Sequence, residues 1–175
     1  NYVYGGQFYG DADITAVMDT WYNGGTEVVF ACGGKIYTSA CEAAQKVNAK
    51  VIGVDTDQSA IIDAAYGEGM TVTSAMKGLY PTTYDTLTDV VINGNWDKYV
   101  GQIATLGLIS GDDPEANYVQ IPMTTQFEDG KFTAEDYHGL VKAMFDGSLS
   151  VSSDVTKSAS DFATVITVDD QGSIK

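Results

Sequence analysis

Four residues that could bind a small polar ligand stand directly after apolar stretches of the chain: Phe8, Gly33, Asp55 and Lys77. An aromatic ring can stack on a flat ligand, and a glycine lets the backbone approach a ligand closely. A carboxylate only accepts hydrogen bonds and an ammonium only donates them, so together they can hold vicinal hydroxyl groups, which do both. The set predicts a nucleoside site, with the base on Phe8 and the ribose on Asp55 and Lys77.

Strands are the elements that must position these residues. The stretch 50–55 is almost continuously apolar until Asp55, which is typical of a strand buried on both faces of a parallel sheet. Three further strands are predicted at 2–6, 27–32 and 70–76. Each of the four strands therefore ends at or just before one of the candidate residues.

Helices separate these strands. After Asp11, apolar residues recur with the spacing of one helical face until Asn-Gly-Gly at 23–25: Ile14, Val17, Met18 and Trp21. A second helix is predicted at 37–48, with four residues on its inner side: Tyr37, Cys41, Ala44 and Val47. The alternation predicts an α/β fold, a parallel sheet flanked by helices. Because the carboxyl ends of parallel strands share one edge, the four candidate residues are expected to converge there.

Each candidate residue also has a simpler interpretation. Asp55 could cap the next helix or turn, and Phe8 could be an ordinary core residue. Gly33-Gly34 could be a tight turn and Lys77 a solvated strand end. Each simpler interpretation is common when taken alone, but four such residues together at strand ends favour a site.

The charge balance excludes one class of partner. The net charge is −15, from 24 acidic residues against nine lysines, with no arginine. Nucleic-acid binding needs clustered Lys and Arg, so no nucleic-acid partner is expected. Cys32 and Cys41 lack the spacing of a zinc site, and no metal site is expected. Both are interpreted as small buried residues.

The rest of the chain offers weaker patterns. A helix at 82–91 is predicted to carry three residues inward: Tyr84, Leu87 and Val91. Two short apolar runs follow, at 104–109 and 118–123. Thr133 and Asp136 predict a helix start, with four residues facing inward: Tyr137, Leu140, Val141 and Met144. One more strand is predicted at 162–168.

The chain begins at Asn1 rather than Met and opens in an apolar strand. This predicts the later part of a longer protein, whose targeting signal would lie upstream. No apolar run reaches the length of a transmembrane helix.

Three strand ends resemble a known family. The segments 28–34 (VVFACGG), 51–59 (VIGVDTDQS) and 73–77 (TSAMK) resemble the basic membrane protein family, the PnrA-like substrate-binding lipoproteins of nucleoside ABC importers. The resemblance extends from about Tyr2 to about Val151. It implies that Phe8 stacks on the base and that the Gly33 backbone approaches the sugar. Asp55 and Lys77 would bind the ribose hydroxyls.

The resemblance implies a type I periplasmic-binding-protein fold, in which two α/β lobes close on a purine nucleoside. Residues 1–78 would then belong to the second lobe, and 79–112 would cross into the first. Residues 113–175 would return to the second lobe and form the tail. The first lobe is missing from the chain.

A substrate-binding component of an ABC importer is not an enzyme and needs no cofactor. Its expected partners are a nucleoside, a transporter permease and the missing lobe. The protein is expected at the extracellular face of the membrane or in the periplasm, attached only through an upstream lipid anchor.

Two departures from the family pattern affect the base preference. The family's Gly-Gly-Thr-Gly turn reads Gly-Gly-Lys35-Ile36 here, which adds bulk and a cation beside the site. Asp11 is shifted from the usual position of its counterpart.

Two other functions are considered. Asp55 and Asp57 superficially fit the Asp-x-Asp pattern of a Mg²⁺-dependent, haloacid-dehalogenase-like phosphatase, as nucleophile and general acid. Lys77 could be its lysine, and 111–113 its second acidic cluster. The aspartates of that fold normally end its first strand, whereas two strand–helix units precede them here. A ligand sensor that does not serve transport is the other alternative on the same fold.

Overall fold

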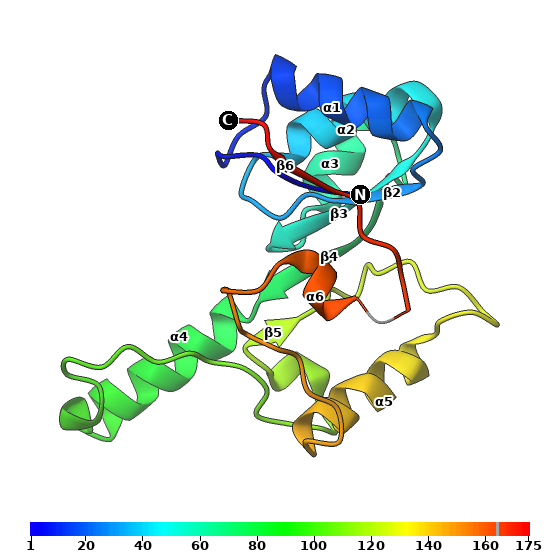
Figure 1. Cartoon of the computed structure of the whole chain (residues 1–175). Coiled ribbons are helices and arrows are strands. Elements are labelled where there is room, and N and C mark those ends of the chain that lie inside the picture. Colours follow the sequence, from blue (N-terminus) through cyan, green and yellow to red (C-terminus); the bar gives the residue numbers. More distant parts are fainter. Residues whose placement is uncertain (164) are drawn as a thin grey trace. The chain divides into compact units, whose positions relative to one another are not determined.

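The computed structural model describes residues 1–163 and 165–175, which form two compact units (Figure 1). The first unit comprises Asn1–Ala75, Pro122–Gln126 and Ser152–Lys175. The second comprises Met76–Ile121 and Phe127–Val151. The fold is mixed α/β, with a mainly parallel sheet and flanking helices, as the sequence predicts. Within the described residues no helix is both long and apolar enough to cross a membrane.

The central sheet contains the strands that were predicted after the first one. β2 (Val28–Phe30) and β3 (Lys50–Asp55) pair in parallel, with Val29 opposite Val51. β4 (Thr71–Lys77) lies on the other side of β3. The last two residues of β4 belong to the second unit, where they pair antiparallel with β5 (Val119–Gln120).

Three helices cover this sheet: α1 (Ala12–Asn23), α2 (Tyr37–Val47) and α3 (Ser59–Tyr66). α2 packs against α1, β3 and α3 (Figure 1). The start of α1 is set by Asp11, whose carboxylate accepts a hydrogen bond from the Ile14 amide. Gly24 ends α1, and Asn48 ends α2 in the left-handed conformation, so both predicted helices are confirmed.

The core of the first unit lies between these helices and the sheet. Its most deeply buried apolar residues are Cys41, Ala44, Val51 and Ile62, each 0% exposed. Burying a side chain of the size of Val or Ile stabilises the fold by about 1.5–3 kcal/mol. Three predictions of burial were wrong. Cys32 is exposed, Val47 is 43% exposed, and β3 is only partly buried on the face of Ile52 and Val54.

The first predicted strand does not join the central sheet. β1 (Tyr2–Tyr4) forms a separate two-stranded parallel sheet with β6 (Asp170–Ser173). The prediction of one sheet containing all four strands was therefore wrong. The predicted strand at 162–168 was wrong too, because Phe162 belongs to α6 (Ala159–Phe162) and 165–168 are irregular; Thr164 lies outside the described residues.

The second unit is built around two helices. α4 (Leu79–Leu87) begins before Pro81 and continues as a π-helical turn (Thr88–Ile92). Short 3₁₀ turns follow at Trp96–Lys98 and Pro114–Ala116. α5 (Ala134–Phe145) starts with the reciprocal capping box of Thr133 and Asp136 that the sequence predicts.

Burial in this unit differs from the prediction. The three residues expected to face inward from 82–91 are all more than half exposed: Tyr84, Leu87 and Val91. On α5, Val141 is buried but Leu140 is 40% exposed. The apolar side chains of this unit do not gather into a core as those of the first unit do: Leu79, Ile92 and Ile103 are also each more than half exposed.

Candidate functional site

Phe8 lies in the segment that follows β1 and contacts the turn that follows β2. Its ring is 76% exposed, and its carbonyl oxygen accepts a 2.7 Å hydrogen bond from the Lys35 amide. Gly34 has a φ of +53°, and a Cβ there would lie 3.2 Å from the Phe8 carbonyl oxygen. A Cβ on the buried Gly33 would lie 3.7 Å from the ring atom Cδ1 of Phe8. The structure therefore brings Phe8 and Gly33 together, and the glycines allow the close approach.

Gln58 connects this turn to the end of β3. Its side-chain oxygen accepts a 2.9 Å hydrogen bond from the Val54 amide, and its side-chain nitrogen lies 3.4 Å from the Gly34 carbonyl oxygen. The backbone amide of Gln58 also donates a hydrogen bond to the Ser74 hydroxyl on β4. Gly53 leaves the room for this arrangement, since a Cβ there would lie 2.7 Å from the Gln58 oxygen. The carboxyl ends of β2 and β3 are thus joined through one side chain.

The sequence reasoning assigned no role to Gln58. The available signal was its place at the end of the six-residue stretch 53–58 (GVDTDQ), within the segment that resembles the family. A glutamine gives no periodicity or charge signal, so only the tertiary contacts reveal its role.

Asp55 closes β3 in an unusual conformation. Its φ is +70°, in the left-handed region where residues other than glycine are uncommon. Asp tolerates this region better than most residues because its short polar side chain can hydrogen-bond locally. Such conformations cost on the order of 1–3 kcal/mol and cluster at functional sites. The outlier, at a partly exposed carboxylate, makes Asp55 a candidate functional residue.

The side chain of Asp57 is held by hydrogen bonds that stabilise the local fold. One carboxylate oxygen accepts from the Ser59 amide at 3.0 Å, and the other accepts from the Thr124 hydroxyl at 2.9 Å. Partial burial raises the pKa of Asp57, but hydrogen bonds from Ser59 and Thr124 outweigh it and hold the pKa below its ordinary value. A general acid needs the opposite shift, so this environment disfavours the phosphatase interpretation. In the described part of the chain, no three His, Cys, Asp or Glu side chains are grouped closely enough to hold a metal ion.

Lys77 is the exposed last residue of β4 and pairs with Val119 of β5. It belongs to the second unit, whereas Phe8, Gly33 and Asp55 belong to the first. Its convergence with those three residues stays a prediction.

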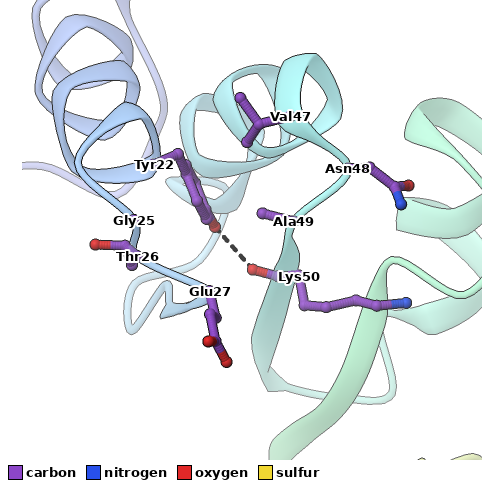
Figure 2. Close-up of a pocket in the computed structure, with 8 residues that line it drawn as sticks. All are labelled: Tyr22, Gly25, Thr26, Glu27, Val47, Asn48, Ala49 and Lys50. Atoms are coloured by element: carbon purple, nitrogen blue, oxygen red, sulfur yellow. Dashed lines mark hydrogen bonds between the residues drawn. The ribbon is translucent and has the colours of Figure 1, made fainter.

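A hollow of about 340 Å³ lies at the opposite edge of the sheet, beside the amino ends of β2 and β3 (Figure 2). The Tyr22 hydroxyl within it donates a 2.8 Å hydrogen bond to the Lys50 carbonyl oxygen. The Lys50 ammonium donates to the Gly69 carbonyl oxygen, outside the hollow. Thr26, Glu27 and Asn48 also line the hollow, but none of the four predicted site residues does, and we place the candidate site at the carboxyl ends.

The comparison with protein families covers most of the chain. A family model described as "Bmp: ABC transporter substrate-binding protein PnrA-like" matches residues 1–112. The matched region includes the four candidate residues and Gln58. No curated protein matches the chain.

Proposed function

Since this chain belongs to the Bmp family of PnrA-like ABC transporter substrate-binding proteins, we propose that its ligand is a purine nucleoside bound at the carboxyl ends of β2 and β3. The family implies a small-molecule ligand and a transporter permease as partner. Nucleoside specificity is our proposal, as is the release of the ligand chemically unchanged.

One observation carries the proposal. Phe8 is 76% exposed and lies against the Gly33-Gly34 turn, and Gln58 connects that turn to Val54, the neighbour of Asp55. An exposed ring provides a stacking platform for a base, and stacking contributes about 1–3 kcal/mol. The Asp55 carboxylate can accept hydrogen bonds from ribose hydroxyls, each worth about 1.5–3 kcal/mol because the acceptor is charged.

We propose that Lys77 donates to the same ribose and that the site is completed by a further α/β lobe. Residues 79–112 would belong to that lobe, with 1–78 and 113–175 forming the second. The exposed apolar residues of the second unit support this proposal: Tyr84, Leu87 and Val91. Leaving several such side chains in water forgoes about 1.5–3 kcal/mol each, which a covering lobe would recover. An upstream lipid anchor would then hold the protein on the outer side of the membrane.

A ligand screen tests the nucleoside class. Saturation-transfer NMR on this chain can detect weak binding of purine nucleosides, pyrimidine nucleosides, free bases and ribose. We expect the purine nucleosides to give the strongest transfer, because they alone supply both a large flat base and the ribose. Equal transfer for ribose alone, or none for any nucleoside, would reject the proposal.

A further inference from the structure

Residues 169–175, the return segment, lie beside the segment that carries Phe8. β6 runs parallel to β1, as the red and dark blue ribbons of Figure 1 show. The Tyr2 amide donates to the Asp169 carbonyl oxygen at 2.8 Å, and the Ile174 amide donates to the Tyr4 carbonyl oxygen at 2.9 Å. The return segment lies outside the region that the family model matches.

The last residue of the return segment reaches the start of α1. The Lys175 ammonium lies 2.9 Å from Asp11 Oδ2 and 2.8 Å from Asp13 Oδ2. The stem of Lys175 covers Gly6, where an added Cβ would lie 2.6 Å from the Lys175 Cβ. Gly6 has a φ of +74°, so both the backbone conformation and the lack of room for a side chain favour glycine at this position.

Asp11 also contacts Gln7, so it links Lys175 to the residues that flank Phe8. Its Oδ2 accepts a 2.8 Å hydrogen bond from the Gln7 side-chain nitrogen, which also donates to the Tyr9 carbonyl oxygen at 2.9 Å. Its Oδ1 accepts from the Ile14 amide and is thereby fixed to α1. The contacts from Lys175 through Asp11 and Gln7 therefore bracket Phe8 on both sides.

Phe8 needs such external support because its own ring is mostly in water. On one side the backbone is held by the Lys35 amide, and on the other by Gln7 and its contacts to Asp11. Gln7 and Phe8 lie in no strand or helix. The orientation of Phe8 thus depends on these two attachments.

We propose that Lys175 is a positioning residue for the ligand site: through Asp11 and Gln7 it holds the backbone of residues 7–9 so that Phe8 presents its ring to the ligand. This inference rests on the proposed function, in which Phe8 stacks on the base. Lys175 itself does not touch the ligand.

Amide exchange at Lys35 measures the positioning directly, without any ligand. The variant Lys175→Met keeps most of the stem and removes the charge. We expect it to speed exchange at the Lys35 amide about tenfold, as loss of a charge-assisted contact does. The Ala31 amide, which bonds to Ile52 within the central sheet, is the internal reference and should not change.

Two variants control this measurement. Lys175→Arg keeps the positive charge and should restore slow exchange at Lys35. Lys46→Met removes a matched surface ion pair of the same unit, Lys46 with Asp19 at 2.7 Å, and should leave the Lys35 amide unchanged. Unchanged exchange in Lys175→Met, or an equal acceleration at Ala31, would overturn the positioning role.

Nucleoside titration provides the second readout. If positioning matters for binding, Lys175→Met should weaken nucleoside binding severalfold, while Lys46→Met should not. Faster exchange at Lys35 with unchanged binding would overturn the link to the ligand. If the unaltered chain binds no nucleoside, the proposed function fails, and with it the role of Lys175 at a nucleoside site, while the exchange data still decide whether Lys175 holds residues 7–9.

Discussion

The Lys35 amide donates a 2.7 Å hydrogen bond to the Phe8 carbonyl oxygen, although β1 and β2 belong to different sheets. This contact, with the bridge between Tyr9 and Lys35, aligns the segment after β1 with the turn after β2. The exposed ring of Phe8 and the glycine turn therefore meet without a shared sheet.

Replacing the Phe8 ring should weaken ligand binding without unfolding the chain. Phe8→Leu keeps an apolar side chain but removes the stacking face, so nucleoside binding should weaken about tenfold. The free energy of unfolding should change by less than about 0.5 kcal/mol, because the ring is 76% exposed. Phe8→Tyr keeps the ring and is the matched control. NMR titration and urea unfolding provide both numbers; equal binding by the Leu and Tyr variants would contradict the stacking role.

The two aspartates at the end of β3 should behave differently. Asn tolerates the left-handed conformation of Asp55, so Asp55→Asn should fold normally and lose the charged acceptor. Its nucleoside binding should fall by about tenfold or more. Asp57→Asn should weaken binding less but destabilise the fold, because Asp57 is hydrogen-bonded to Ser59 and Thr124. Titration and unfolding of both variants test this; the reverse ranking of binding losses would refute the assignment.

The two thiols should differ sharply in reactivity. Cys32 is exposed beside Gly33, whereas Cys41 is 0% exposed and burial raises the pKa of its thiol to about 12. Since the thiolate is the reactive form, the folded chain should react with Ellman's reagent at one site. Both should react in denaturant. Cys32→Ser is the control and should abolish the reaction of the folded chain; two rapid thiols in the native state would contradict the structure.

The contacts of Asp11 with the Ile14 amide and the Lys175 ammonium should make the free energy of unfolding fall at acid pH. The Ile14 amide, and then the Lys175 ammonium, hold the pKa of Asp11 at about 2, below its ordinary value of 3.8. A folded-state pKa below the unfolded one contributes stability above pH 3.8, and this contribution is lost as the pH falls through about 2.

Asp11→Asn tests this linkage, because Asn also caps helices but carries no charge. The variant should be less stable than the unaltered chain at about pH 5, and the difference should shrink as the pH falls toward about 2. Urea unfolding at several pH values measures it. A difference that stays constant with pH would show that the charge of Asp11 does not contribute.

Local signals made much of the fold predictable. The helical spacing of Ile14, Met18 and Trp21 and the capping box at Thr133 each act within about two turns of a helix, so the sequence contains them in full. Phe8 and Gly33 do lie together, but the predicted reason, a shared edge of one parallel sheet, was wrong, because β1 pairs with β6 outside the central sheet.

Long-range contacts could not be predicted in the same way. β6 has the polar sequence Asp-Gln-Gly-Ser and no alternation, so nothing marks it as a partner of β1. The prediction that Tyr84 and Leu87 are buried was wrong, because helical spacing identifies an apolar face but not what covers it. Gln58 was missed because its role comes entirely from tertiary hydrogen bonds.

We propose that a purine nucleoside binds at the carboxyl ends of β2 and β3. Chemical-shift mapping of this chain with adenosine and inosine tests it most directly. With one lobe supplying the contacts, we expect weak binding, with a Kd on the order of 1 mM, and shifts at the amides of Gly33, Lys35 and Asp55. Shifts confined to Tyr22 and Lys50, beside the hollow at the amino ends, or no shifts at millimolar nucleoside, would contradict the account.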